Sequence, residues 1–363
     1  MKNIITHSIV CLMFIMISNS ALLFSSQDIQ SVSQEWWNAP YPKRFNAANI
    51  SKKSSFIRVE GNKFVDENGN RVLFSGVNIS DPDKIQKNGH WTKRHFEVIK
   101  EWGANIVRVP VHPAAWQERG KEEYFKLLDQ SVSWAVELEL YLIIDWHSVG
   151  NLKTGLFQHS MYETTKQETY DFWRSVAFRY KNIPTIAFYE IFNEPTTYNG
   201  QLGRITWQEW KKINEEIIHI IFSHDRNVIP LVAGFNWGYD LKPIKESPIE
   251  IEGIGYVSHP YPQKTTEPFE ENWERDFGFV ADKYPLFATE LGFMAAEDPG
   301  SHIPVISDEK YGQRIIHYFK KKDISWTVWN FDPDWPPQLI SDWNYTPTKQ
   351  GTFFRNVMLN WSK

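Results

Sequence analysis

Apolar positions from residue 56 onward follow two alternating patterns. Short runs rich in Val, Ile and Phe, typical of buried strands, are separated by segments whose apolar residues recur every three to four positions, as in helices. The runs predict eight core strands, at Val72–Ile79, Asn105–Val111, Tyr141–His147, Thr185–Asn193, Val228–Gly234, Ile254–His259, Leu286–Glu290 and Ile324–Asn330. Helical patterns lie between them, at residues 92–103, 124–139, 167–180, 207–223, 269–284 and 311–322. Strands that alternate with helices pair in parallel.

Eight strand–helix units predict an α/β fold of the (β/α)8 TIM barrel type. Arg58–Glu60 and Lys63–Asp66 predict a β-hairpin that caps the bottom of the barrel. The alternative is a doubly wound open sheet, which is disfavoured because GVNISDPDK after the first strand has no glycine-rich phosphate loop. The weakest unit follows the fifth strand, where DLKPIKESP is short and broken by proline.

The N-terminus has the pattern of an export signal. Residues 1–21 combine a Lys-bearing start, a short apolar run at Ile9–Ile17 and small residues before a cleavage point. The run is too short to span a bilayer securely, although Leu22, Leu23 and Phe24 keep a retained anchor open as the alternative. Residues 22–55 are polar and irregular and predict a flexible segment, which leaves residues 56–363 as the barrel domain. We therefore expect a secreted protein, whether extracellular, periplasmic or at the cell surface.

Charge and aromatic content narrow the choice of ligand. The formal net charge is -5 and no long basic block occurs, which argues against a nucleic-acid partner. The chain carries 17 Trp, more than a core usually needs, so some are expected to stack on sugar rings in a groove. Six lie in or near predicted top loops: Trp116, Trp207, Trp210, Trp237, Trp335 and Trp343. Trp207 and Trp210 are three residues apart, as expected of helix packing residues.

Polar residues stand where the predicted strands end. In a TIM barrel the C-terminal strand ends open into one shared mouth. Those ends carry Arg108, Asp145, His147, Asn193, Glu194, His259, Tyr261, Thr289, Glu290, Trp329 and Asn330. Each residue alone is commonly a structural or solvated residue, but their occurrence at successive strand ends indicates one site.

Two of these residues predict the chemistry. Glu194 and Glu290 end the fourth and seventh strands, which lie roughly across the mouth, so both carboxylates can face a bound sugar chain. Carboxyl groups about 5–5.5 Å apart suit a retaining glycosidase, whereas about 6.5–9.5 Å suits an inverting one. We assign Glu194 as the acid/base and Glu290 as the nucleophile, whose charged form Arg108 would favour.

The remaining candidates surround this pair. Asn193 is expected to donate a hydrogen bond to the sugar 2-hydroxyl. Tyr261 would orient the nucleophile, and His147 and His259 would hold the sugar and the acid/base. Trp329 would form the floor on which a sugar stacks.

Neither a metal nor an organic cofactor is expected. Asp332 and Asp334 are candidates for metal ligands, but a turn-forming or sugar-contacting role is favoured because no second acidic cluster accompanies them.

The ordered motifs RVPVHP, IIDWH, IFNEP, SHPYP, FATELGF and WTVWNF resemble glycoside hydrolase family 5 of clan A. The resemblance runs from Phe56 to Trp361 and implies a catalytic (β/α)8 domain. It implies a site made of Arg108, His147, Asn193, Glu194, His259, Tyr261, Glu290 and Trp329. SHPYP departs locally from the family pattern, because proline separates His259 from Tyr261.

Within this family, the Trp residues in or near the predicted top loops favour an endo-β-1,4-glucanase, because they suit the flat faces of a glucan chain. Long loops at Gly150–Gln167, Thr196–Thr206 and Phe331–Thr348 predict a groove walled on its sides, which favours internal cleavage of a chain. An endo-β-1,4-mannanase or a xyloglucanase is the alternative, and a non-catalytic polysaccharide-binding barrel is a further one. We expect a monomer that binds a β-glucan or β-mannan and does not insert stably into a membrane.

Overall fold

The structure, a computed structural model, describes residues 35–46 and 54–361. The signal peptide predicted for residues 1–21 lies outside the described residues, as does much of the predicted flexible segment. Within the described part, no helix combines the length and the apolar character that crossing a bilayer requires.

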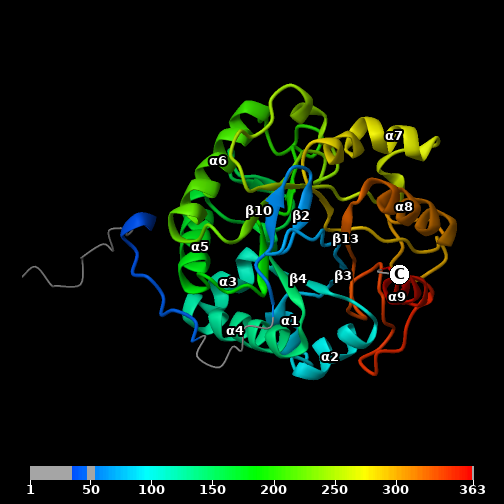
Figure 1. The fold of residues 1–363 in the computed structure, drawn as a ribbon, viewed down its shortest axis with the longest axis horizontal. Helices are drawn as coiled ribbons and strands as arrows, with labels where there is room; N and C mark the ends of the chain where they lie inside the picture. Colours follow the sequence, from blue (N-terminus) through cyan, green and yellow to red (C-terminus); the bar gives the residue numbers. More distant parts are fainter. Residues whose placement is uncertain (1–34, 47–53, 362–363) are drawn as a thin grey trace, which may run out of the picture.

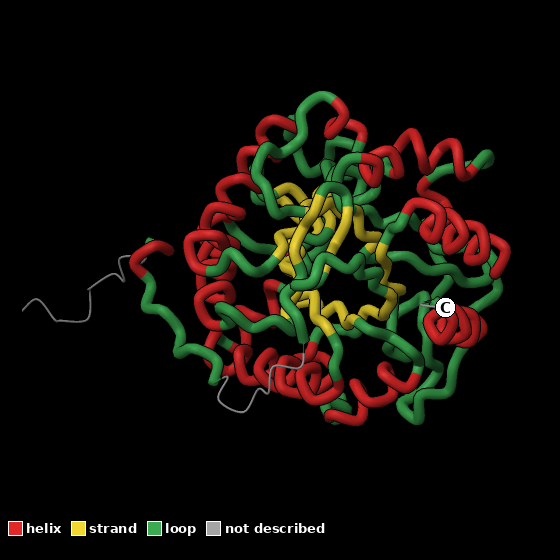
Figure 2. The backbone as a smooth tube through the Cα atoms, viewed as in Figure 1, coloured by secondary structure: helices red, strands yellow, loops and turns green. Residues whose placement is uncertain are grey.

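A closed parallel barrel of eight strands forms the centre of the molecule, and helices surround it (Figures 1 and 2). In chain order the strands are β3 (Ser75–Asn78), β4 (Ile106–Val111), β5 (Tyr141–Trp146), β8 (Ile186–Glu190), β10 (Ile229–Ala233), β11 (Gly255–Val257), β12 (Leu286–Ala288) and β13 (Ser325–Val328). Each strand pairs with its chain neighbour, and β13 pairs with β3 to close the ring. Every strand lies inside its predicted range, so the TIM-barrel prediction is confirmed.

The outer layer contains helices that the apolar spacing predicted and several that it did not. The α-helices are α1 (Pro82–Lys87), α2 (Lys93–Glu101), α3 (Pro113–Arg119), α4 (Lys121–Leu138), α5 (Lys166–Arg179), α6 (Trp207–His224), α7 (Phe269–Asp276), α8 (Glu309–Lys322) and α9 (Lys349–Asn360). Short 3-10 helices occupy Trp36–Asn38, Ser160–Tyr162, Lys242–Lys245, Pro262–Lys264 and Gly278–Asp282. The proline-broken unit after β10 is reduced to one of these 3-10 turns, as its sequence indicated.

The helix expected over residues 269–284 is interrupted. It runs to Asp276 and continues as a 3-10 helix from Gly278. A Cβ at Gly278 would lie 1.7 Å from the Tyr318 hydroxyl of α8, so the chain passes here only because glycine has no side chain.

A hairpin closes the bottom of the barrel. Strands β1 (Arg58–Glu60) and β2 (Lys63–Val65) pair antiparallel as the predicted hairpin, with Val59 opposite Phe64. Phe64 of β2 is buried against Phe188, with ring centroids 4.8 Å apart, and against Phe74 and Phe287. These rings fill the lower interior of the barrel together with Ile106 and Ile143.

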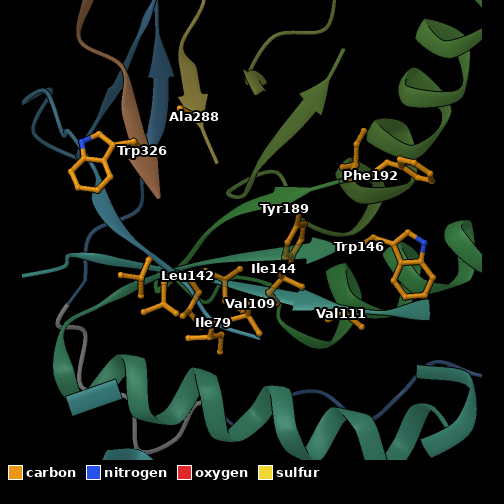
Figure 3. Packing of buried hydrophobic residues seen from close by; sticks show 14 of the residues in the cluster. Ile79, Val109, Val111, Leu142, Ile144, Trp146, Tyr189, Phe192, Ala288 and Trp326 are labelled. Carbon is orange, nitrogen blue, oxygen red and sulfur yellow. The ribbon is translucent and has the colours of Figure 1, made fainter. Parts of the chain in front are cut away.

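Strand alternation separates the outer core from the barrel interior. On β4, Val107 and Val109 pack outward in the main core, whereas Ile106 and Arg108 face the interior. Figure 3 shows outward-facing members of the main core, among them Val109, Leu142 and Ile144. The same alternation turns Asp145 and Glu190 inward, so a charged layer lies above the apolar one.

One titratable residue is buried in the outer core without a polar partner. His95 of α2 is 0% exposed, and neither of its ring nitrogens has a hydrogen-bond partner among the described residues. It contacts the rings of Phe331, Trp343 and Tyr345, which belong to the segment after β13. Burial, with a smaller contribution from His90, lowers the pKa of His95 to about 3.

We expect the His95→Phe variant to resist acid better than the wild type. An unfolded histidine takes up a proton near pH 6.5, whereas the folded one stays neutral down to about pH 3. The unfolded state therefore binds more protons between these values, and stability is lost as the pH falls through this window. The Tm drop between pH 7 and pH 4 should be smaller in His95→Phe, measured by circular dichroism. The exposed α6 residue supplies the control, His219→Phe, and equal drops in all three proteins would contradict the prediction.

Candidate active site

Arg108 is the centre of the charged layer. Its side chain is fully buried and donates from Nε to Glu190 Oε2 at 2.7 Å and from a terminal nitrogen to Glu190 Oε1 at 2.9 Å. The same guanidinium donates to Glu290 Oε1 at 2.8 Å and to Asn193 Oδ1 at 2.7 Å, and it lies 3.0 Å from Asp145 Oδ2. It thereby fixes side chains that come from the ends of β5, β8 and β12.

His259 connects the two carboxylates proposed for catalysis. Its Nδ1 lies 3.0 Å from Glu194 Oε1 and 3.9 Å from Glu290 Oε2. Its Nε2 contacts Thr289 Oγ1 at 3.0 Å and Glu190 Oε1 at 3.3 Å. Burial opposes a charge on this ring, but Glu290 and the hydrogen bonds to Glu190 and Glu194 outweigh it and raise the pKa of His259 to about 9. The ring is therefore an imidazolium at neutral pH, and both nitrogens donate.

Glu290 is held by two donors. Arg108 donates to its Oε1, and the Tyr261 hydroxyl donates to its Oε2 at 2.9 Å. Burial raises the pKa of Glu290; His259 and Arg108 oppose the shift without cancelling it. The carboxyl group is thus fixed in orientation on both oxygens.

Glu194 does not extend barrel strand β8, which ends at Glu190. It forms a two-residue strand, β9 (Glu194–Pro195), that pairs with β6 (Val149–Asn151), and β6 pairs with β7 (Leu156–Phe157). Pro195, the second residue of β9, lies opposite Gly150. This small sheet lies above the barrel and carries Glu194 over the mouth.

Glu194 and Glu290 face each other across an open cavity. A carboxylate oxygen of Glu194, a ring nitrogen of His259 and a carboxylate oxygen of Glu290 all lie within 4.8 Å of one another. The two carboxylate oxygens are therefore no more than 4.8 Å apart. Both residues line a cavity of about 800 Å³, which we call the main cavity. Its lining also includes His147, Asn193 and Tyr261, together with the rings of Trp329, Trp335 and Trp237.

Arg108 and His259 lie beneath this cavity and are absent from its lining. Both are 0% exposed, and their observed partners are carboxylates, the side-chain amides of Asn78 and Asn193, and a hydroxyl. Asn193, in contrast, lines the cavity and uses its Oδ1 to accept from Arg108, so its NH2 group is left to donate to a ligand.

His147 and Trp329 form one wall. Their rings are stacked with centroids 5.4 Å apart. His147 Nδ1 lies 2.6 Å from Asp145 Oδ2, and burial, with the nearby charges of His112 and Arg108, lowers the pKa of His147 well below its usual value. The neutral ring donates from Nδ1, which leaves Nε2 as an acceptor for a sugar hydroxyl.

Two buried carboxyl groups support the site without lining it. Burial acts against the ionised form of Glu190, but Arg108 and His259 outweigh it and lower the pKa of Glu190. For Asp145 burial dominates and raises the pKa well above the usual value, although Arg108 opposes it. Glu190, which forms the bidentate pair with Arg108, is thus the more acidic of the two carboxyl groups.

Sequence reasoning did not single out Glu190. It lies four residues before Glu194 and two before the end of the apolar run, at an inward position of β8. A carboxylate at an inward position of a buried strand requires a buried cation nearby. The inward arginine of β4, Arg108, could therefore have pointed to Glu190.

A metal is not required to explain the close group formed by Glu194, His259 and Glu290. Both ring nitrogens of His259 already contact carboxylate or hydroxyl oxygens, and an imidazolium has no free lone pair for a metal.

Asp332 and Asp334 form a turn and an ion pair. The Asp334 backbone N–H donates to Asp332 Oδ1 at 2.7 Å, and Lys84 Nζ lies 2.6 Å from Asp332 and 3.0 Å from Asp334. This agrees with the turn-forming role favoured from the sequence.

Of the six Trp residues considered for sugar stacking, Trp237 and Trp335 line the cavity. Trp116, Trp207 and Trp210 are buried in the main core, and Trp343 packs against it and stacks on His90. The helix packing expected of Trp207 and Trp210 is confirmed.

Comparison with known proteins places the chain in a family. The family described as Cellulase (glycosyl hydrolase family 5) matches residues 65–334. A β-glucanase from Saccharophagus degradans, whose crystal structure contains cellotetraose, is 50% identical, with a TM-score of 0.88, over 90% of this chain and 99% of that one. The catalytic domain of endoglucanase Cel5A from Thermobifida fusca is 22% identical with a TM-score of 0.67, over 85% of this chain and 98% of that one, and shares the barrel fold.

Curated relatives are longer than the matched region. Endoglucanase A from Butyrivibrio fibrisolvens is 27% identical over 286 residues, which is 76% of this chain and 59% of that protein. The family match, which covers most of the barrel, and the 50% identity to a β-glucanase agree with the motifs at the strand ends. The chain belongs to glycosyl hydrolase family 5 and is a glycoside hydrolase.

Proposed function

We propose that the chain is a retaining, endo-acting β-1,4-glucanase in which Glu194 is the acid/base and Glu290 the nucleophile. The observation that carries the proposal is the approach of their carboxylate oxygens to within 4.8 Å in the main cavity. An oxygen–oxygen approach this short favours the roughly 5–5.5 Å carboxyl separation of retaining enzymes over the roughly 6.5–9.5 Å of inverting ones.

In the first step, Glu194 protonates the glycosidic oxygen while Glu290 attacks C1. His259 donates to Glu194 Oε1, so the transferable proton resides on Oε2. Arg108 and Tyr261 each bind one oxygen of Glu290, which limits its rotation and presents one oxygen to the sugar. The bond from C1 to the leaving oxygen breaks as the bond to Glu290 forms.

In the second step, a water molecule attacks C1 and releases Glu290. Glu194, now a carboxylate, accepts the proton of this water. Asn193 donates to the 2-hydroxyl of the sugar, a hydrogen bond that strengthens in the oxocarbenium-like transition state. Trp329 supplies the apolar face on which the sugar rests.

A β-glucan is the favoured substrate. The 50% identical β-glucanase was crystallised with cellotetraose, and the curated relatives are named endoglucanases. A cavity of about 800 Å³ lies near the upper end of ligand-site volumes, which supports binding of an oligosaccharide segment. A mannanase or xyloglucanase shares the same catalytic residues and remains the second candidate.

A substrate panel tests the proposal. Purified protein should hydrolyse carboxymethyl cellulose or mixed-linkage β-glucan faster than xyloglucan, mannan and xylan, measured as reducing sugar. Viscosity of a soluble glucan should fall early in the reaction if cleavage is internal. Faster hydrolysis of mannan, or sugar release without loss of viscosity, would contradict the substrate or the endo mode.

We also propose that residues 1–21 direct export of the protein. Mass spectrometry of protein recovered from the culture medium or periplasm should find an N-terminus near residue 22. An intact N-terminus in the membrane fraction would favour the retained anchor.

Replacement of the nucleophile should separate binding from catalysis. We expect Glu290→Ala to lose at least about 10⁴-fold in kcat, because no group remains to form the covalent intermediate. Cellotetraose binding should stay measurable by calorimetry. Glu297→Ala, outside the main cavity, is the control and should retain wild-type kcat. Activity within tenfold of wild type in Glu290→Ala would refute the assignment, and release of an α-configured product by the wild type would refute retention.

Loss of the Tyr261 hydroxyl should move the acid side of the pH profile. This hydrogen bond lowers the pKa of Glu290, so Tyr261→Phe raises it further. Because the nucleophile must be ionised, the acidic limb of kcat/KM should shift to higher pH, with about a tenfold loss of activity at the optimum. Tyr318→Phe, which removes a hydroxyl that contacts Glu274 instead, is the control. A limb that stays in place or moves to lower pH would contradict the role of Tyr261.

A further inference from the structure

One wall of the main cavity is formed by an aromatic pair. The rings of Tyr198 and Trp237 meet edge to face with centroids 5.8 Å apart, and Trp237 Nε1 donates to Gln158 Oε1 at 2.7 Å. Both aromatic residues have left-handed backbones, with φ of 45° and 55°. Bulky residues rarely adopt this conformation, and such strain is concentrated at functional sites.

Lys264 lies against this pair. Its Nζ donates to the Asn236 carbonyl at 3.0 Å and lies 4.6 Å from the centroid of the Trp237 ring. Among the described residues that line the main cavity, Lys264 is the only lysine or arginine. An ammonium group has three donors, so two remain for a ligand after the contact with Asn236. We call Gln158, Tyr198, Trp237 and Lys264 the Trp237 wall.

The Trp237 wall lies on the same side of the main cavity as Glu194, the proposed acid/base. Tyr198 follows Glu194 by four residues, and the carbonyl of Gly238, next to Trp237, accepts from the backbone N–H of His259 at 3.2 Å. Trp329 follows β13, and in the ring of eight strands β13 lies opposite β8, the strand that leads to Glu194 and Tyr198. The two aromatic surfaces therefore lie on different sides of the catalytic pair.

Burial lowers the pKa of Lys264, and the charges of Glu194 and Glu290 act in the opposite direction. Lys264, Glu194 and Glu290 line the same cavity. An acid/base stands between the sugar attacked at C1 and the sugar that leaves. Trp329 is the surface proposed for the sugar attacked at C1, and the Trp237 wall lies on the other side of the catalytic pair, so it faces the sugar that leaves.

We propose that Lys264 binds the leaving-group sugar through charge-assisted hydrogen bonds to its hydroxyls, and that the same contact holds a sugar acceptor for transglycosylation. This inference rests on the proposed function. The ligand is a pyranose with equatorial hydroxyls. Its apolar face stacks on Trp237, and its hydroxyls accept hydrogen bonds from the Lys264 ammonium group.

The transfer step balances without any further reactant. A hydroxyl oxygen of the bound acceptor forms a bond to C1 while the ester bond from C1 to Glu290 breaks. The hydroxyl proton goes to the Glu194 carboxylate, which restores the resting enzyme and yields a longer chain. Water performs the same step in hydrolysis, so acceptor binding at Lys264 sets the ratio of the two products.

The test compares two substrates that differ only in what leaves. Cellotetraose loses a sugar, whereas β-cellobiosyl fluoride loses fluoride and needs no leaving-group site. In Lys264→Met, kcat/KM should fall about tenfold for cellotetraose and stay within twofold for the fluoride. With cellobiose added to the fluoride reaction, the ratio of transfer product to hydrolysis product should also fall about tenfold, measured by mass spectrometry. Lys264→Arg should recover part of both losses.

Lys245→Met is the matched control, because Lys245 also lies over an aromatic ring, Phe279 at 4.4 Å, but outside the cavity. It should leave both substrates and the product ratio unchanged. Equal losses on cellotetraose and the fluoride, or no loss on either, would overturn the role of Lys264 while the wild type still cleaves glucan. A wild type that cleaves neither substrate would overturn the proposed function and this inference with it.

Discussion

The buried guanidinium of Arg108 is the interaction on which the site depends. A cation inside a barrel is tolerated only when carboxylates and hydrogen bonds compensate its loss of hydration. Arg108 meets this condition with Glu190 in a bidentate pair and with Glu290. Because arginine presents its donors in a fixed planar fork, it also sets the relative positions of groups from β8 and β12. Lysine at this position would offer one point charge and lose that geometry.

This constraint explains why the barrel interior has two layers. Phe64 of the hairpin, Phe188 and Phe287 fill the bottom and exclude water there. A water-excluded floor strengthens the electrostatic interactions of the layer above it. The hairpin is far from the chemistry along the chain, yet it contributes to the dielectric surroundings of Arg108 and Glu290.

The sequence predicted the barrel and the cavity residues well because both follow from local patterns. Alternation with period two locates buried strands, and polar residues at the C-terminal ends of parallel strands converge in any TIM barrel. The break at Gly278 was not predictable, because it depends on Tyr318 from a helix distant in sequence. The strand β9 was also missed, because a two-residue strand has no periodicity and exists only through its pairing with β6. The role of Glu190 likewise required its partner on β4, a contact that one sequence does not display.

The net charge of the buried side chains stays constant through the proposed mechanism. Arg108 and the imidazolium of His259 bring two positive charges, Glu190 brings one negative charge, and the proposed mechanism adds an ionised Glu290. Formation of the covalent intermediate neutralises Glu290 and ionises Glu194, so the negative charge moves from one to the other while the total stays constant. His259 lies 3.0 Å from one and 3.9 Å from the other, and its single positive charge therefore stabilises both states. These contacts are already formed among the buried side chains, as electrostatic catalysis by a preorganised site requires.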